Sequence, residues 1–305
     1  MKCPCLSELP APPPGKTGWP WTEETPVTIE SINGHHDRIT IVTPCFNSGR
    51  FLEETIRSVL LQGYPDLEYI VIDGGSNDDS KEIIRKYEKW ITFWQSEKDR
   101  GWPDAINKGF SRATGTIRAW MPASDSYLPS ALVVANRYLR NSDLDIIYGE
   151  SLFVDEMGVN QGMSRTAKNL RHLMIYGRGM PVQCAIFWKT HLHEKVGLFK
   201  PEIRIAADRE WFLRACVPAR SRWIPEITCS YRQHAGQLSA SVNVRLREEF
   251  EAWRDTLRAN HISQFQIICG ALVFVPLMHY RTGGLKRLFS IPRISCIKHI
   301  LFRKN

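Results

Sequence analysis

Short apolar runs alternate with stretches of helical periodicity between residues 39 and 121. The runs that we predict as buried strands are residues 39–43, 69–72, 91–95 and 116–121, with Pro44 ending the first. The helices predicted between them cover residues 53–61, 81–90 and 104–113. This alternation is typical of an α/β fold: a doubly wound, mostly parallel sheet with helices on both faces. Ligands of such sheets bind beyond the carboxyl ends of the strands.

The second half of the chain has a less regular pattern. It predicts strands at residues 145–148 and 151–154, and helices at residues 208–215 and 245–260. The most apolar stretch, IICGALVFVPLM at residues 267–278, is shorter than the about 20 residues of a membrane-spanning helix. We therefore expect three regions: a proline-rich lead-in without its own core (1–37), an α/β domain (38–260), and an apolar, then basic, helical extension (261–305).

Composition and charge narrow the class of protein. Hydrophobic residues make up 43% and charged residues 24%, as in ordinary soluble proteins, and the formal net charge is +8. Residues 281–305 contain Lys and Arg but no acid, so much of the excess lies in the tail. The basic residues form no recognisable nucleic-acid module, which argues against a nucleic-acid partner. The tail is either a peripheral contact with anionic lipid or a core helix followed by a basic end.

Cysteine usage and the N-terminus bear on the compartment. The eight cysteines are scattered, and the first residues lack the apolar core of a secretory signal. Both features favour a cytoplasmic protein with free thiols. If the basic tail contacts lipid, the contact is expected at the inner face of the membrane.

Polar and acidic residues follow each strand predicted in the first half of the chain. Asn47 follows the first strand, Asp73 the second, Glu97 and Asp99 the third, and Asp125 the fourth. Any one of them alone would be read as a turn or cap residue. Together they are expected to meet in one crevice, where Asp125 can bind a divalent cation whose shell phosphate oxygens complete.

The chain resembles the family 2 glycosyltransferases, whose fold is called GT-A, in segments that follow one another in the same order. These segments are ITIVTPCFNSGRFLEETIRSVLLQGYPDLEYIVIDGGSNDDS from residue 39, SEKDRGWPDAINKGFSRATG from 96, WMPASDSYLPSAL from 120, RGMPVQCAIFWK from 178, IAADREWFLRA from 205 and YRQHAGQLSAS from 231. Together they span about 200 residues of the chain, from residue 39 to residue 241. No single segment is decisive, but their common order is specific.

The resemblance implies a donor site at the strand ends. The residues that it places around the nucleotide are Thr43, Pro44, Asn47, Asp73, Asp99, Lys108, Ser124 and Asp125. Asp73 is expected to accept a hydrogen bond from the base, while Asp125 matches the metal-binding carboxylate of the Asp-x-Asp signature. His234 matches a late histidine that can complete the shell of a Mn²⁺ or Mg²⁺ ion.

The resemblance also implies the catalytic residues. Asp208 matches the catalytic base, which removes the proton from an acceptor hydroxyl so that the anomeric carbon is attacked with inversion. A helix N-cap is the structural alternative for Asp208, and Glu210 is the alternative base. Gly179 and Met180 fall in the loop that faces donor sugar and acceptor. Trp102 either stacks on base, sugar or acceptor, or serves packing alone.

The expected function is thus that of a non-processive, inverting glycosyltransferase. It would move a sugar from a UDP- or dTDP-sugar to a hydroxyl of a glycan or lipid-linked acceptor, in the synthesis of a cell-envelope polysaccharide. One departure weakens the metal site, because Ser124 stands where close relatives of the pattern carry an acid. A non-catalytic nucleotide-sugar or glycan-binding module therefore stays open. A sugar nucleotidyltransferase is disfavoured, since TPCFNSG is not the glycine-rich basic loop that such enzymes carry.

Overall fold

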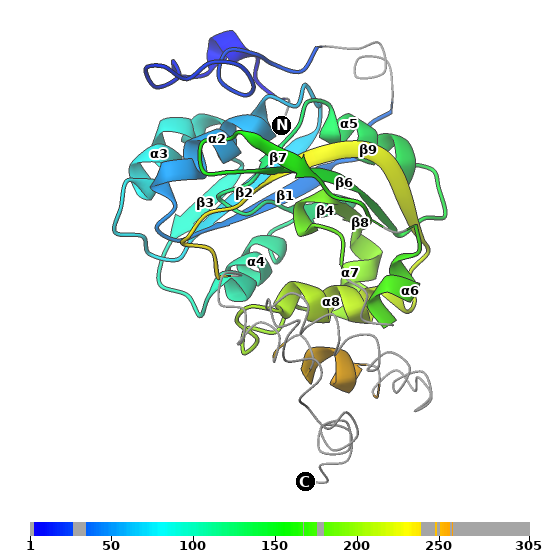
Figure 1. Cartoon of the computed structure of the whole chain (residues 1–305). Helices are drawn as coiled ribbons and strands as arrows, with labels where there is room; N and C mark the ends of the chain where they lie inside the picture. The colour runs from blue at the N-terminus through cyan, green and yellow to red at the C-terminus, as the bar shows by residue number, and fades with distance from the viewer. Residues whose placement is uncertain are drawn as a thin grey trace, which may run out of the picture.

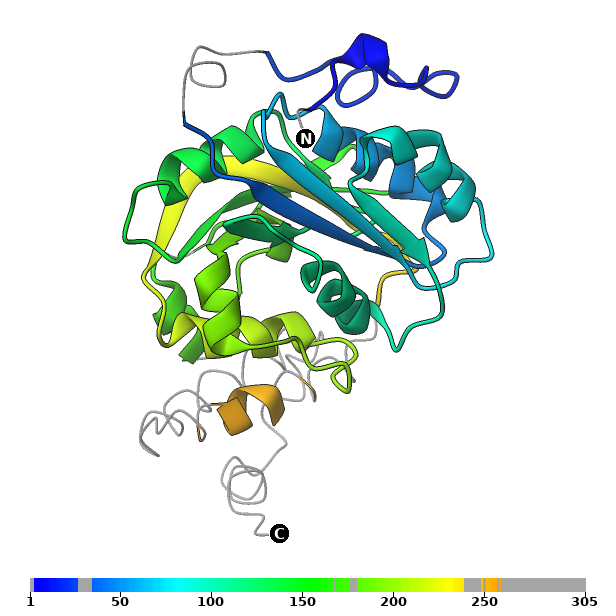
Figure 2. The same cartoon turned by 180° about the vertical axis from the view of Figure 1, so that it is seen from behind.

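The structure is a computed structural model that describes residues 3–26, 35–166, 168–175, 180–238, 248, 251–256 and 258. These residues form one nine-stranded sheet with helices on both faces (Figures 1 and 2). Its first half consists of β1 (Ile39–Cys45), β2 (Leu67–Asp73), β3 (Phe93–Ser96) and β4 (Ile117–Trp120). They lie in the order β3-β2-β1-β4 and are all parallel, as the sequence predicts.

Beyond β4 the sheet is mixed. Its strands are β5 (Ser126–Tyr127), β6 (Ile146–Val154), β7 (Asn160–Met163), β8 (Ile186–Lys189) and β9 (Ser221–Arg232). The order continues β4-β8-β6-β9-β5, and β7 pairs with β6 at the side. Only β6 and β9 are parallel in this half, and the other pairs are antiparallel. The α/β class is confirmed, with the parallel arrangement confined largely to the first half.

Helices cover both faces of the sheet (Figure 1). One face carries α2 (Gly49–Leu60), α3 (Ser80–Tyr87) and α5 (Ala131–Leu139). The other carries α4 (Trp102–Phe110), α6 (Leu170–Ile175), α7 (Thr190–Val196) and α8 (Ala207–Cys216). Short 3₁₀ turns lie at Leu6–Glu8, Glu88–Trp90 and Gln183–Ala185. Gly109 lets α4 approach β1, because a Cβ there would lie 2.5 Å from a methyl of Val42.

Two strand predictions are wrong in their boundaries. Pro44 does not end β1, which continues to Cys45 with Pro44 paired beside Ile72. The two strands expected at residues 145–148 and 151–154 are one strand, β6. Gly149 in its middle marks a close approach of β9 rather than a strand end, because a Cβ there would lie 2.7 Å from the Glu226 carbonyl oxygen.

The N-terminal segment, residues 3–26, lies against the domain on the side of α2 and α5 (Figure 1). Cys3 and Leu9 join the hydrophobic core, and Trp21 is 6% exposed. The lead-in expected from the sequence therefore shares the core of the domain instead of hanging free of it. Three backbone carbonyl groups of this segment accept hydrogen bonds from Arg57, a fully buried residue of α2.

The C-terminal predictions fall mainly on residues that the structure does not describe. Of the helix predicted at residues 245–260, residues 251–256 are helical, and the extension at residues 261–305 lies outside the described residues. Within the described part of the chain, every helix is too short or too polar to traverse a bilayer.

A buried histidine on α7 predicts a loss of stability in mild acid. His193 lies among the rings of Phe110 and Trp211, and no described residue pairs with its Nδ1. Burial, with the nearby positive charges of Arg118 and Arg214, lowers the pKa of His193 from 6.5 to about 4. The native histidine thus stays neutral while the unfolded chain takes up a proton, so stability falls as pH drops from 6.5 towards 4.

When the pH drops from about 7 to about 5, the free energy of unfolding should fall by about 2 kcal/mol because of His193. The variant His193→Phe should lack this share of the decrease, which urea unfolding at the two pH values measures. His191→Gln on the same helix is the control, since His191 is exposed and pairs with Asp145. A decrease of equal size in wild type and His193→Phe would contradict the assignment.

Candidate active site

A cleft of about 1560 Å³ opens at the carboxyl ends of β1, β2 and β4. Ordinary small-molecule sites have volumes of about 300–1,000 Å³, so this cleft has room for an extended ligand. Nine of the residues predicted from the sequence line it: Pro44, Asn47, Asp99, Trp102, Ser124, Asp125, Met180, Asp208 and His234. Gly179, which was also predicted to belong to the site, lies outside the described residues. Segments far apart in the chain thus meet where the sequence expects a donor site.

Three predicted donor-site residues do not line the cleft. Thr43 is fully buried, with its hydroxyl 3.1 Å from the Tyr69 hydroxyl. Lys108 points to Glu97, with 2.8 Å between Nζ and the carboxylate. Both side chains thus make contacts within the fold.

Asp73 is the third of these residues and organises the turn after β2. Its side chain is fully buried, and Oδ2 accepts hydrogen bonds from the backbone N–H groups of Gly75 (3.2 Å) and Ser76 (3.0 Å) and from the Ser96 hydroxyl (2.6 Å). The Ser76 hydroxyl donates to Oδ1. Both oxygens of Asp73 are thus engaged within the fold, and Asp73 organises this loop.

Asp99, which follows β3, lines the cleft as the sequence predicts. Its Oδ1 accepts from the Gly101 N–H at 2.8 Å, which fixes the carboxylate. The carboxylate lies over Gly74, where a Cβ would come within 2.9 Å of Oδ2. Partial burial raises the pKa of Asp99, while the Gly101 N–H and Lys108 lower it. Glycine at position 74 is thus what gives this carboxylate room.

Asp125 is the acid that the sequence assigns to a cation. It is 2% exposed, and its Oδ1 accepts from the backbone N–H of Arg232 at 2.9 Å. Its Oδ2 has no hydrogen-bond partner among the described residues. Burial raises the pKa of Asp125 to about 7, against the lowering effect of Arg232. A buried carboxylate oxygen without a partner fits a divalent cation, since Mg²⁺ and Mn²⁺ prefer oxygen ligands.

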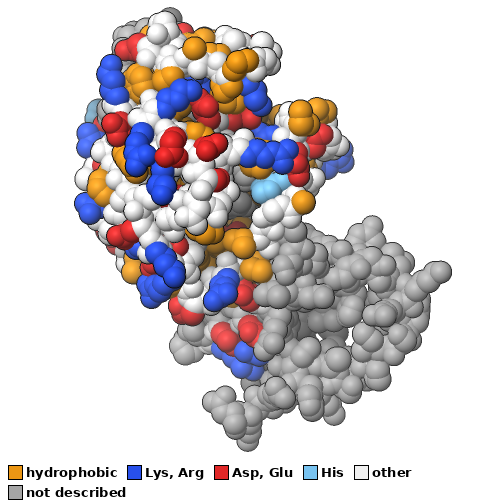
Figure 3. All heavy atoms as spheres, turned by 90° about the vertical axis from the view of Figure 1, so that its left-hand side faces the viewer, with side chains coloured by type: hydrophobic (Ala, Val, Ile, Leu, Met, Phe, Trp, Pro, Cys, Tyr) orange, Lys and Arg blue, Asp and Glu red, His pale blue; other side chains and the backbone are white. Residues whose placement is uncertain are grey.

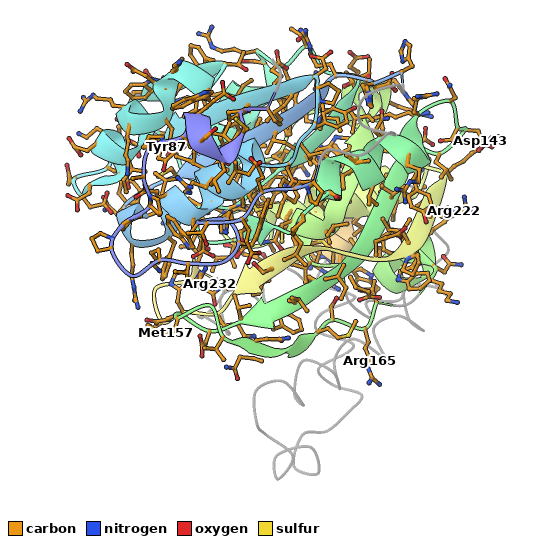
Figure 4. The ribbon with its side chains drawn as sticks, turned by 90° about the horizontal axis from the view of Figure 1, so that it is seen from above. Tyr87, Asp143, Met157, Arg165, Arg222 and Arg232 are labelled. Atoms are coloured by element: carbon orange, nitrogen blue, oxygen red, sulfur yellow. The ribbon has the colours of Figure 1, made fainter. Side chains whose placement is uncertain are left out.

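Arg232, at the end of β9, holds this part of the cleft together (Figure 4). Its guanidinium donates to the carbonyl oxygens of Ser124 (3.1 Å) and Asp155 (3.1 Å) and pairs with Glu54 of α2. His234 follows two residues later and packs against the ring of Phe51, with 5.0 Å between centroids. The predicted ligands Asp125 and His234 are thus both fixed by the end of β9.

The metal-binding capacity of the protein alone is limited. In the described ranges, His, Cys, Asp and Glu side chains do not come together in threes to hold a metal ion. Asp125 and His234 would therefore need oxygen atoms of a bound diphosphate to complete the shell of a cation. Ser124 lines the cleft beside Asp125 without adding charge, as its sequence position suggests.

Asp208 lies in the first turn of α8, half-buried on the cleft wall. The N-cap reading of this residue is wrong: the N-cap position is Ala206, and Glu248 accepts from the N–H groups of Ile205 (2.7 Å) and Ala206 (3.1 Å). The carboxylate of Asp208 accepts from the adjacent Arg209 N–H at 2.7 Å. Among the described residues no side chain forms a capping hydrogen bond to α8, and Asp208 lines the cleft.

Glu210, the alternative base, does not line the cleft. Its side chain is 1% exposed and forms ion pairs with Arg214 (2.8 Å) and Lys200 (2.7 Å). Both partners fix the position of this carboxylate inside the protein. The structure therefore leaves Asp208 as the acid of this helix that a substrate can reach.

Several aromatic residues of the cleft are absent from the sequence prediction, and two of them lie at or just after the carboxyl end of a parallel strand. Phe46 follows β1 and is 60% exposed, although large apolar side chains are usually buried. Trp120 ends β4 and stacks on Trp102, with centroids 5.1 Å apart and planes 13° apart. In both cases the position of an aromatic residue at the carboxyl end of a predicted parallel strand could have indicated a place on the cleft wall.

Comparison with known proteins agrees with this geometry. The sequence model of the family described as "Glycosyl transferase family 2" matches residues 40–199. An uncharacterized glycosyltransferase of Mycobacterium tuberculosis is 29% identical over 197 residues, which cover 63% of this chain and 74% of that protein. An uncharacterized glycosyltransferase of Rickettsia prowazekii is 23% identical over 235 residues, covering 72% and 71% respectively.

Solved structures share the fold. Residues 1–349 of TarS from S. aureus, in complex with UDP-GlcNAc, superpose with a TM-score of 0.62 at 14% identity, covering 87% of this chain and 78% of that one. The mannosyltransferase PcManGT from Pyrobaculum calidifontis, in complex with GDP-Man and Mn²⁺, gives 0.60 at 16% identity, covering 91% and 83%. With the family match over more than half of its length, the chain belongs to glycosyl transferase family 2 and is a glycosyltransferase with a GT-A-type α/β fold.

Proposed function

We propose that the chain transfers a sugar from a nucleoside-diphosphate sugar to a hydroxyl of a glycan or lipid-linked acceptor, with inversion at the anomeric carbon. The observation that carries this proposal is the meeting of Asp99, Asp125 and Asp208 in one cleft. The solved relatives TarS and PcManGT were crystallised with UDP-GlcNAc and with GDP-Man, which supports a nucleotide-sugar donor. UDP- and dTDP-sugars, the donors favoured by the sequence, are the first candidates, in the synthesis of a cell-envelope polysaccharide.

Each carboxylate has a distinct task in the proposed reaction. Asp99 accepts a hydrogen bond from the nucleoside, beside the exposed ring of Phe46 on which a base can stack. Asp208 accepts the proton of the acceptor hydroxyl as that oxygen forms its bond to the anomeric carbon. The bond to the diphosphate breaks on the opposite face, which inverts the configuration.

Asp125 and His234 would hold a divalent cation, Mn²⁺ or Mg²⁺, against the diphosphate. When bound, such a cation neutralises the charge that develops on the leaving diphosphate. Arg232 keeps Oδ1 of Asp125 engaged through its backbone N–H, which leaves Oδ2 for that purpose. The peripheral membrane contact suggested by the tail remains a proposal, because residues 261–305 lie outside the described residues.

Calorimetric titration with UDP, dTDP, GDP and CMP tests the donor site, with Mn²⁺, with Mg²⁺ and with a chelator. We expect one nucleotide to bind, and to bind at least about tenfold more tightly with metal, because a cation held by Asp125 would neutralise the charge of the diphosphate. Asp125→Asn should lose the metal-dependent part of the affinity only. If wild-type affinity is the same with chelator, the metal assignment fails. If a nucleotide binds but no acceptor hydroxyl is ever glycosylated, the non-catalytic module replaces the enzyme.

Substitution of Gly74 tests the position of Asp99 in the donor site. A methyl group in Gly74→Ala would meet Oδ2 of Asp99 at 2.9 Å and push the carboxylate away. We expect nucleotide affinity to fall about tenfold, as for Asp99→Asn, because the same hydrogen bond is lost. The double variant Gly74→Ala/Asp99→Asn should bind no more weakly than Asp99→Asn alone. Additive losses would show that position 74 acts on the nucleotide by another route.

The distribution of charge on one face of the molecule (Figure 3) bears on the question of a nucleic-acid partner. On the face that Figure 3 shows, basic and acidic side chains are intermixed instead of forming a patch of one sign. Nucleic-acid sites rely on a continuous basic surface that contacts phosphates. A sugar donor whose diphosphate is neutralised inside the cleft requires no such surface.

A further inference from the structure

A stacked pair of tryptophans forms part of the cleft wall. Trp120 is the last residue of β4 and Trp102 the first residue of α4, and both line the cleft. The two ring planes differ by only 13°, with 5.1 Å between centroids. Phe199 meets the ring of Trp102 from the side at 6.3 Å. The position of the Trp120 ring is therefore well defined before any ligand binds.

The tryptophan pair is connected to the two segments that carry Asp208 and Asp125. The indole N–H of Trp102 donates to the carbonyl oxygen of Arg204 at 2.7 Å, and Arg204 lies in the segment that leads into Asp208. Trp120 lies on the strand that leads into Asp125. The two indoles thus connect the segment that carries the proposed base with the segment that carries the proposed diphosphate ligand.

Trp120 lines the cleft and carries a hydrogen-bond donor that is buried and unused. Its side chain is 4% exposed, and Nε1 has no acceptor among the described residues. Trp188 also has an unpartnered Nε1, but it is fully buried in the core between Phe110 and Phe212 and does not line the cleft. An unpartnered indole N–H is therefore no site in itself. Its place on the cleft wall distinguishes Trp120, because a bound ligand can supply the missing acceptor.

We propose that Trp120 recognises the donor sugar by donating its indole N–H to a sugar hydroxyl, with Trp102 as the residue that positions its ring. This inference rests on the proposed function. With the diphosphate at Asp125 and the acceptor hydroxyl at Asp208, the sugar ring has to lie between them, beside the indole pair. An indole N–H can only donate, and a sugar hydroxyl can accept, while the apolar face of the indole suits the C–H face of a sugar.

Paired titrations separate the sugar from the nucleotide. UDP and UDP-GlcNAc, and in parallel GDP and GDP-mannose, are titrated into the full-length wild type, Trp120→Phe and Trp188→Phe without acceptor. For the pair that the wild type binds, Trp120→Phe is expected to bind the nucleotide sugar about tenfold more weakly and the free nucleotide unchanged. Trp188→Phe removes the same N–H from the core and should alter neither affinity.

The alternative results are distinct. An equal loss for nucleotide and nucleotide sugar, or no loss for either, overturns the role of Trp120 while leaving the donor site intact. If the wild type binds neither pair nor the other nucleotides, the proposed function fails and the inference falls with it.

A measurement on the wild type avoids reliance on the fold of the variant. In a ¹⁵N-labelled sample with assigned indole resonances, the Nε1 proton of Trp120 should shift downfield with the nucleotide sugar but not with the free nucleotide, since only the sugar supplies an acceptor. The proton of Trp188 should stay in place in both spectra. If the chemical shift of the Trp120 Nε1 proton is the same with nucleotide sugar and with free nucleotide, the proposal is contradicted.

Discussion

Asp208→Asn is expected to reduce sugar transfer by about 10²–10⁴-fold while leaving nucleotide affinity unchanged. The amide keeps the size of the side chain and can still accept from the Arg209 N–H, but it cannot take up the acceptor proton. The position of Asp208 in the first turn of α8, on the cleft wall, gives it access to an acceptor. Calorimetry measures the affinity, and release of nucleoside diphosphate from the donor, with water or a panel of saccharides as acceptor, measures the transfer.

Glu210→Gln is the matched control for this result. Glu210 lies on the same helix, but its ion pairs with Arg214 and Lys200 hold it away from the cleft. We expect this variant to lose stability and to keep its transfer rate per folded molecule within about threefold, well below the loss of a general base. Near-normal transfer by Asp208→Asn would assign the base elsewhere, and a parallel loss of nucleotide binding would make Asp208 a donor ligand.

The sequence predicted the parts of the site that depend on strand ends. Asn47, Asp99 and Asp125 each follow a strand of the parallel half, so the topology alone brings them to one edge of the sheet. Asp208 lies outside that half and could be placed only by the family resemblance. The second half of the sheet is mixed, and strand periodicity carries no information on the direction in which two strands pair.

The direction of single side chains was beyond sequence reasoning. Thr43 and Pro44 are neighbours on β1, yet Thr43 points to Tyr69 in the core and Pro44 lines the cleft. Alternation along a strand states that neighbours face opposite ways, but not which of them faces a ligand. Asp73 and Asp99 differ for a similar reason, because the hydroxyl of Ser96 at the end of β3 donates to Asp73. The strand itself is predicted from the sequence, but this contact across to β2 is not. The role of Arg57 depends on partners far away in the sequence, so it can be recognised only in the structure.

Replacement of Arg57 is expected to have the largest effect on stability. Its guanidinium is fully buried and donates to the carbonyl oxygens of Pro10 (2.8 Å), Pro20 (3.0 Å) and Trp21 (2.9 Å), and to the Tyr87 hydroxyl (3.1 Å). Arg57→Met keeps the aliphatic stem but leaves these acceptors without a donor, at a cost of about 3–5 kcal/mol in the free energy of unfolding. Urea unfolding measures this cost, and limited proteolysis should reveal new cuts within residues 3–26.

Arg85→Ala is the control, because Arg85 is 56% exposed and pairs only with Glu82 on the same helix surface. Such a pair contributes less than about 1 kcal/mol, so both stability and proteolysis should resemble the wild type. If Arg57→Met unfolds earlier but residues 3–26 stay protected, the segment is held by its other contacts, such as the bond from the Trp19 indole to the Tyr127 carbonyl at 2.8 Å. If neither property changes, the buried guanidinium is not what fastens the N-terminal segment to α2. Loss of stability together with new cuts within residues 3–26 would show that Arg57 attaches this segment to the domain.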